Sequence, residues 1–152
     1  MDILIQPATI QDLDLLMDWR MEVLHEVFHL PKDVDLSELT SENRKYYQEM
    51  LPTHQHIACF AKWQDEIVGC GGICIQKEMP SPDNPNGLCG YIMNIYTRKP
   101  YRQQGIGQRI VDWLIKQAKE MHVQKIYLEA SVDGKPLYQK MGFHDMKDYM
   151  KL

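Results

Sequence analysis

The chain has 152 residues, the length of a single domain, with 44% hydrophobic and 25% charged residues, as in ordinary globular proteins. Its formal net charge of −4 argues against a basic surface that gathers nucleic acid or anionic lipid. No apolar run approaches the ~20 residues of a membrane helix, and the acidic N-terminus lacks the pattern of a signal peptide. We therefore expect one cytoplasmic domain over residues 1–152, without nucleic-acid or membrane partners.

The cysteine pattern argues against a metal or redox site. None of the four cysteines forms a Cys-x-x-Cys pair, and zinc-type ligand spacing is absent. Cys70 and Cys74 would share one face of a strand, where thiols pack as small hydrophobic groups. We expect no bound metal.

The first third of the chain predicts one strand and two helices. Residues 3–6 are a short apolar strand, and Thr9 opens a capping-box pattern. Apolar residues at mostly helical spacing then predict a helix from Leu13 that Pro31 ends. A polar, acidic segment leads to a second, shorter helix that stops at Pro52.

The middle of the chain is rich in β-forming residues. Residues 56–63 and 66–76 read as two strands joined by a tight hairpin. Residues 78–87 contain three prolines and two asparagines and predict a loop, and residues 88–97 read as another strand.

The last third alternates helices and strands. A glycine turn leads into an amphipathic helix from Ile106, and residues 125–131 form a strand. Residues 134–141 predict a short helix ended by Gly142, and residues 143–152 a closing strand.

This order predicts an α/β (α+β) fold in one domain. We expect a mixed, mostly antiparallel sheet of about six or seven strands with helices on both faces. Residues 88–131 should form a right-handed parallel crossover that contains the glycine turn.

The glycine turn, "YRQQGIGQRI" at residues 101–110, has the chemistry of a phosphate site. The first N–H groups of a helix lack partners and lie at the positive end of its dipole, and glycines allow phosphate oxygens to approach. A Walker loop is excluded because no Gly-Lys-Ser/Thr follows, and Ile110 occupies the third small position of the dinucleotide fingerprint. The glycines alone are equally compatible with a turn that needs unusual backbone angles.

Two motifs together resemble the GNAT superfamily of acetyl-coenzyme A-dependent N-acetyltransferases. "RQQGIG" matches the family's Arg/Gln-x-x-Gly-x-Gly/Ala motif, and "LYQKMGF" matches Leu-Tyr-x-x-x-Gly-Phe at the family's spacing. The resemblance covers residues 57–150 and implies that acetyl-CoA is the cosubstrate. The implied partner is an amine acceptor, either a small molecule or a protein amine, and family members commonly form homodimers.

The resemblance also implies the cofactor-binding residues. Backbone amides would hold the pyrophosphate, Arg102 would add a charged contact, and the end of the preceding strand would pair with the pantetheine arm. The amide residues are Gln103, Gln104, Gly105, Ile106 and Gly107, and the strand residues are Ile95, Tyr96 and Thr97. Ser131 falls where many relatives carry an asparagine that supports the site.

The resemblance places the catalytic acid at Tyr138, which would give a proton to the coenzyme A sulfur. Packing of the aromatic ring is the alternative interpretation. Residues 87–101 contain no Asp or Glu, so Glu129 is the nearest candidate base, acting through water, and an ordinary solvated carboxylate is its alternative. Asn94 is the polar residue that stands in for a carboxylate in this stretch, and its amide cannot take a proton.

A rival motif, His25-Glu26-x-x-His29, matches the zinc-peptidase pattern, with two histidines four apart on one helix face. Against it, Pro31 follows shortly after His29 and no extended motif is present.

A non-catalytic acyl-CoA-binding module is a third interpretation, since the base is missing. A loop cluster of acidic residues hints at a cationic amine acceptor, with solvated charge as the alternative; it comprises Asp33, Asp35, Glu38 and Glu42.

Overall fold

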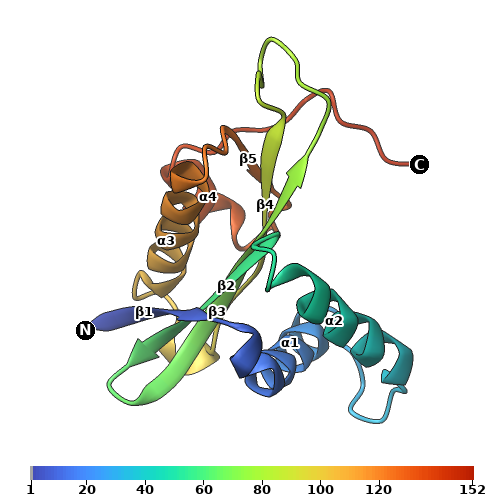
Figure 1. The fold of residues 1–152 in the computed structure, drawn as a ribbon. Coiled ribbons are helices and arrows are strands. Elements are labelled where there is room, and N and C mark those ends of the chain that lie inside the picture. The colour runs from blue at the N-terminus through green and yellow to red at the C-terminus, as the bar shows by residue number, and fades with distance from the viewer. Residues whose placement is uncertain (1) are drawn as a thin grey trace.

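A computed structural model describes residues 2–152 and contains a five-stranded open sheet (Figure 1). The strands run in the spatial order β1-β2-β3-β4-β5, and their bounds are Ile3–Ala8, His56–Trp63, Glu66–Lys77, Leu88–Thr97 and Lys125–Leu128. The first four strands pair antiparallel, and β5 pairs parallel to β4. This mixed sheet confirms the predicted fold class, although it has fewer strands than the six or seven expected.

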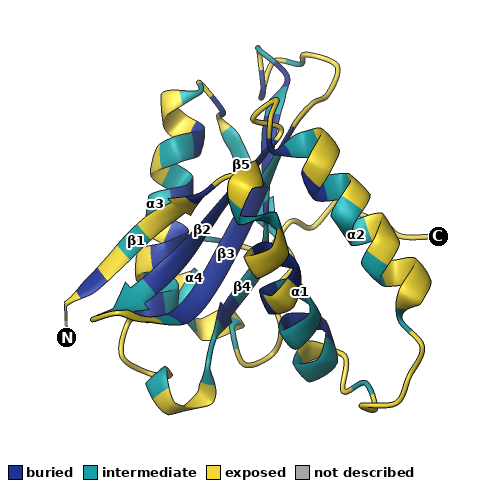
Figure 2. Ribbon diagram, turned by 60° about the horizontal axis from the view of Figure 1, so that its bottom comes forward, coloured by how far each residue is buried: buried dark blue, intermediate teal, exposed yellow. Residues whose placement is uncertain are grey.

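Helices cover both faces of the sheet (Figures 1 and 2). Helices α1 (Leu13–Val27) and α2 (Ser37–Met50) lie on one face, and α3 (Ile106–Glu120) with the short α4 (Lys135–Lys140) lies on the other. No helix within residues 2–152 has the length and apolar character of a membrane span.

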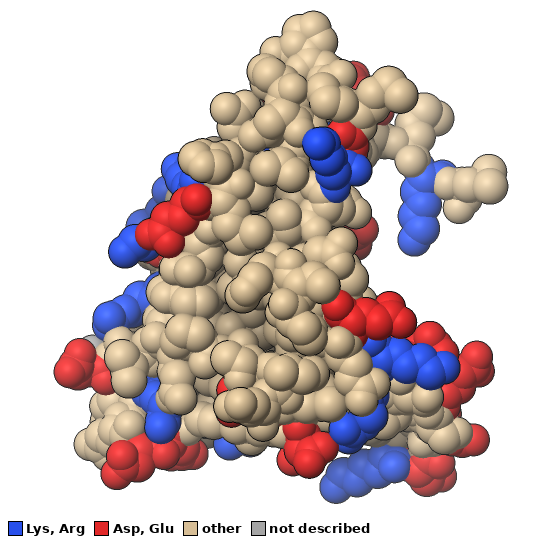
Figure 3. All heavy atoms as spheres, viewed as in Figure 1, with Lys and Arg blue, Asp and Glu red and all other residues tan. Residues whose placement is uncertain are grey.

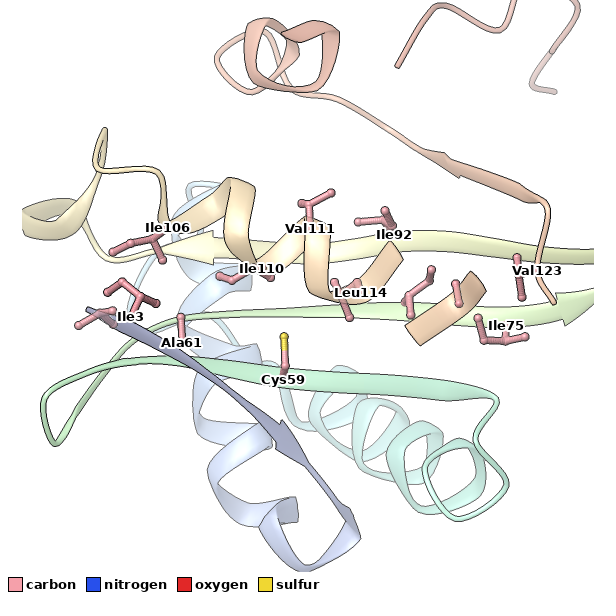
Figure 4. Close-up of a cluster of buried hydrophobic side chains, with 13 residues drawn as sticks. Ile3, Cys59, Ala61, Ile75, Ile92, Ile106, Ile110, Val111, Leu114 and Val123 are labelled. Carbon is pink, nitrogen blue, oxygen red and sulfur yellow. The ribbon is translucent and has the colours of Figure 1, made fainter. Parts of the chain in front are cut away.

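Each face of the sheet buries its own core. The α3 core is the larger, because the predicted apolar stripe of α3 is buried along its whole length (Figure 4). Its helix residues are Ile106, Ile110, Val111, Leu114 and Ala118. The second core, under α1 and α2, contains Leu16, Met17, Trp19, Tyr47, Phe60 and Tyr96.

Gly71 sits where the α3 core leaves no room for a side chain. A Cβ atom there would lie 2.4 Å from Cγ2 of Ile110 and 2.8 Å from Cδ1 of Ile95. We predict that Gly71→Ala lowers the free energy of unfolding by ~1–3 kcal/mol, since both side chains must shift. Urea unfolding measures it, with Gly107→Ala as the control because its Cβ would make only an ordinary 3.5 Å contact. Equal unfolding midpoints would contradict the packing described.

One predicted helix end is corrected, and one predicted helix start is confirmed. Helix α1 ends at Val27, before Pro31, and His29 follows with a φ of 52°. Val27 and Phe28 are exposed, so the apolar stripe loses its buried surface one turn early. Thr9 does form the predicted capping box: its N–H donates to Asp12 at 2.9 Å, at the start of the 3-10 turn before α1.

The closing strand predicted at 143–152 is wrong. Residues 144–152 are exposed and form no ladder with β5, which itself ends at Leu128 rather than at residue 131. Phe143 packs against the ring of Tyr138, and Asp145 pairs with Lys135, so local contacts to α4 hold this segment instead of strand pairing.

Candidate functional site

The glycine turn adopts the backbone that its sequence predicted. Gly105 is the N-cap of α3 with φ 79°, and Gln103 has φ 60°. A Cβ atom at Gly105 would meet nothing within 4 Å, so glycine is favoured there by the backbone angle rather than by space.

The turn presents a row of free backbone donors. Within residues 2–152, no hydrogen bond uses the N–H groups of residues 103–107. They lie at the positive end of a 15-residue helix, and residues 103–105 are exposed. Ile106 contributes only its backbone, because its side chain is buried in the α3 core. This N–H cradle, residues 103–107, fits the phosphates of a cosubstrate.

Strand β4 leads through a short 3-10 turn (Lys99–Tyr101) into the cradle, and its last stretch has a neighbour, β3, on one side only. β5 pairs with β4 only from Cys89 to Ile92, so Ile95–Thr97 extend past the end of that ladder. The side chains of Ile95 and Tyr96 pack into the two cores. An extended ligand would therefore meet mainly the backbone on the β5 side of this stretch, as the pantetheine prediction requires.

Arg102 is held away from the cradle. Its Nε donates to the carbonyl oxygen of Thr97 at 2.7 Å, its guanidinium pairs with Glu26 of α1, and it lies over the ring of Tyr96. The predicted phosphate contact stays a prediction, and in this structure the guanidinium binds Thr97 and Glu26. The residue instead ties α1 to the end of β4.

A second ion pair strengthens the same tie. Arg98 binds Glu22 of α1 through two hydrogen bonds of 2.9 and 3.1 Å and stacks over Trp19 at 4.2 Å. The hydrogen bond from Arg98 lowers the pKa of Glu22, and the hydrogen bond from the Tyr96 hydroxyl lowers the pKa of Glu26.

These lowered pKa values predict an acid-sensitive fold. A carboxyl group whose pKa falls on folding stabilises the protein above its ordinary value of 4.5 and loses that contribution as pH falls through the folded pKa. We expect the free energy of unfolding to decline below about pH 4.5, and less steeply in Glu22→Gln/Glu26→Gln. Urea unfolding from pH 7 to 3 measures this. Glu49→Gln is the control, because Glu49 is exposed and forms no salt bridge with residues 2–152; identical pH profiles in both variants would contradict the prediction.

Strand β4 carries a bulge at the centre of the α1–α2 face. Asn94 has φ 61°, and the β3–β4 register shifts between Cys70 and Gly72. Bulges re-aim backbone and side-chain groups and are common beside active sites. Asn94 turns its side-chain oxygen toward Arg20, which donates to it at 2.9 Å.

A cavity of about 280 Å³ opens beside this bulge, between α1, α2 and β4. We call it the acceptor cavity. Its lining residues are Arg20, Glu42, Asn43, Tyr46, Tyr47, His56, Met93 and Asn94. Outside it, side chains of both signs mix over α1 and α2, so the predicted acidic cluster does not form a separate acidic field (Figure 3).

His56 forms the inner wall of the cavity. Its Nδ1 lies 2.7 Å from the hydroxyl of Tyr46, and it is almost fully buried. Burial, helped by the charge of Arg20, lowers its pKa to about 4, so its imidazole is neutral at pH 7. Burial also raises the pKa of Tyr46, which therefore stays protonated.

Helix α4 lies against the start of α3, since Leu137 is the nearest neighbour of Gly107. Tyr138 follows Leu137 on this helix. Tyr138 is half-buried, its ring centroid is 5.9 Å from that of Phe143, and burial raises its pKa. Among residues 2–152 no hydrogen bond engages its hydroxyl, which is thus protonated and free to donate at neutral pH.

Comparison with known proteins identifies the family. A sequence model described as the acetyltransferase (GNAT) family matches residues 17–143. The chain belongs to the GNAT family.

Other GNAT sequences show partial matches. The chain is 29% identical over 118 residues to an N-alpha-acetyltransferase of Sulfurisphaera tokodaii, covering 70% of this chain and 68% of that protein. It is 32% identical over 119 residues to N-alpha-acetyltransferase 30 of Saccharomyces cerevisiae, covering 76% of this chain and 66% of that protein. It is 26% identical to glucosamine 6-phosphate N-acetyltransferase of Arabidopsis thaliana, covering 57% of this chain and 58% of that protein. The chain thus spans about two thirds or less of these relatives.

GNAT structures match over nearly the whole chain. A crystal structure of a predicted acetyltransferase with acetyl-CoA from Clostridium acetobutylicum superposes with a TM-score of 0.88 at 28% identity, covering 99% of this chain and 96% of that one. The glucosamine-6-phosphate N-acetyltransferase structure from Arabidopsis thaliana gives a TM-score of 0.73 at 21% identity. The second match supports the fold alone.

The other two predicted residues of this GNAT site, Glu129 and Ser131, lie in the loop between β5 and α4. Glu129 is exposed and follows Leu128, which pairs with Ile92, so it lies near the β4 bulge without lining the acceptor cavity. The hydroxyl of Ser131 accepts the N–H of Gly134 at 3.1 Å. That hydrogen bond stabilises the turn before α4.

The zinc-peptidase geometry does not form. His29 lies beyond the end of α1, so it does not share a helix face with His25. Glu26 is engaged by Tyr96 and Arg102. Residues 2–152 contain no group of three potential metal ligands.

The sequence interpretation missed most of the acceptor cavity. Asn43, Tyr46 and His56 looked like ordinary helix and strand residues, because only the tertiary fold brings them together. Arg20 carried a signal, since it interrupts the apolar stripe of the first helix.

Proposed function

We propose that this GNAT protein is an N-acetyltransferase that transfers the acetyl group of acetyl-CoA to a primary amine by direct attack in a ternary complex. The observation that carries the proposal is the N–H cradle of residues 103–107, which follows the stretch of β4 that β5 leaves open, Ile95–Thr97. The acceptor cavity begins at the other end of that stretch, at the β4 bulge. The acetyl thioester would lie between the two.

The residues supply the steps of the transfer. The neutral amine attacks the thioester carbonyl carbon, and a backbone N–H of β4 stabilises the oxyanion. As the carbon–sulfur bond breaks, Tyr138 donates its proton to the departing sulfur and regains one from solvent. The amine nitrogen loses its extra proton through water to Glu129. The products are the acetylated amine and coenzyme A.

The named relatives act on different amines: one name specifies glucosamine 6-phosphate, and two specify an α-amino group. For this chain the cavity of about 280 Å³ lies near the small end of the usual range of ligand sites. Its size favours a small acceptor over a folded protein chain.

An acceptor screen monitored by free thiol tests the proposal. Purified protein is mixed with acetyl-CoA and single amines from a panel, and the expected result is thiol release that requires both protein and amine. Binding of acetyl-CoA without amine-dependent release would favour the non-catalytic binding module. One tightly held zinc per chain, lost in His25→Ala, would favour the peptidase instead.

A further inference from the structure

Arg20 holds its guanidinium group in the wall of the acceptor cavity. Its Nε donates to Oδ1 of Asn43, and its Nη1 donates to Oδ1 of Asn94, both at 2.9 Å. Asn43 is itself oriented by a 2.8 Å hydrogen bond to the carbonyl oxygen of Leu39. Two neutral amides therefore fix the group while only two of its five N–H donors are used.

The charge of Arg20 is not balanced by a carboxylate. Arg98 and Arg102 on the same side of the sheet each bind a glutamate, whereas Arg20 forms no salt bridge with residues 2–152. Glu42 is the acidic residue in the cavity lining, and it pairs with Lys45 at 3.2 Å. The positive charge of Arg20 also acts on His56 in the inner wall of the cavity, because it contributes to the lowered pKa of that histidine.

The shape of the group indicates what would balance it. A guanidinium presents a planar fork of donors that matches carboxylate and phosphate oxygens, and a fixed fork loses little entropy on binding. We propose that the acceptor is a small primary amine that also bears a carboxylate or phosphate, and that Arg20 binds this anionic group. This inference rests on the proposed acetyltransferase function.

Only one of the four residues of the acidic cluster lines the cavity: Glu42, which pairs with Lys45. Asp33, Asp35 and Glu38 are exposed and lie outside the cavity lining, and Asp35 accepts the N–H of Ser37 at the start of α2. A cationic acceptor would also bring its charge next to Arg20, where like charges repel.

Matched pairs of amines test the inference. We would compare phosphoethanolamine with ethanolamine, and β-alanine with β-alaninamide, in the parent, in Arg20→Gln and in Arg44→Gln. Arg44 is the control because it pairs with Asp14 and does not line the cavity. The parent should prefer the anionic member of at least one pair. Arg20→Gln should lower the ratio of kcat/KM for the anionic member to kcat/KM for its neutral partner ~10- to 100-fold, as for the loss of a charge-assisted contact, whereas Arg44→Gln should keep the ratio of the parent.

Each outcome of these assays either supports or overturns the inference about Arg20. The preferred pair shows whether phosphate or carboxylate is the better anion. Equal or better turnover of the neutral amines would overturn the inference while leaving the acetyltransferase proposal intact. If no probe amine reacts, melting temperatures of coenzyme A-saturated protein decide: anionic probes should stabilise the parent and not Arg20→Gln, and no stabilisation overturns the inference. Failure to bind acetyl-CoA at all would instead refute the proposed function.

Discussion

Replacing Tyr138 by phenylalanine is expected to lower turnover ~100- to 10,000-fold while acetyl-CoA affinity stays nearly constant. The change removes one hydroxyl and keeps the ring that packs against Phe143, so the fold should survive. Without the phenol, the thiolate must leave unassisted or with a proton from water. The expected loss corresponds to ~3–5 kcal/mol of transition-state stabilisation. Steady-state kinetics and a calorimetric titration with acetyl-CoA separate the two effects.

Tyr101→Phe is the matched control for Tyr138→Phe. The hydroxyl of Tyr101 donates to Glu66 at 2.7 Å, on the surface, so its loss should leave turnover close to that of the parent. If Tyr138→Phe retains turnover within about threefold of the parent, under conditions where chemistry limits the rate, Tyr138 has a packing role alone.

The second large effect is expected from Gly107→Trp, which should weaken acetyl-CoA binding more than ~100-fold. The new side chain starts 3.5 Å from Leu137, so α4 blocks one side and the indole must cover the N–H cradle. Losing even one or two charge-assisted bonds to phosphate, at ~1.5–3 kcal/mol each, accounts for that change. Calorimetric titration measures it, and circular dichroism checks that the variant is folded.

Gly107→Ala is the control that separates coverage of the N–H cradle by the indole from a general effect of losing the glycine. Its Cβ would make an ordinary contact, so acetyl-CoA affinity should stay within a few-fold of the parent. Parent-like affinity in a folded Gly107→Trp variant would show that the pyrophosphate binds somewhere other than residues 103–107.

Features that depend on neighbouring residues were predictable from the sequence. The buried stripe of α3, the hairpin strands and the glycine turn each follow from local spacing and backbone preference, and all are present. The family resemblance assigned the role of acid to Tyr138, and that role stays a prediction. Its neighbour Leu137 is the residue that a Cβ atom at Gly107 would meet, at 3.5 Å.

Features that depend on distant partners were not predictable. Arg102 is the first residue of the phosphate-binding motif in the sequence, but Glu26, 76 residues away, binds its guanidinium. The same contact engages the glutamate of the apparent zinc motif. Arg20 was visible as a charge in an apolar stripe, yet its partners Asn43 and Asn94 lie 23 and 74 residues away. Residues 143–152 had strand-like composition, but pairing also requires a neighbouring strand.

The most direct test of acetyl transfer follows the acetyl group itself. Acetyl-CoA labelled with ¹³C in the acetyl group is incubated with the protein and the best amine of the screen, and both the new amide and free coenzyme A are quantified by NMR. We predict one amide formed for each coenzyme A released in the parent, and very little of either in Gly107→Trp. Release of coenzyme A with free acetate and no amide, or tight binding of acetyl-CoA with no consumption in any amine, would contradict the account.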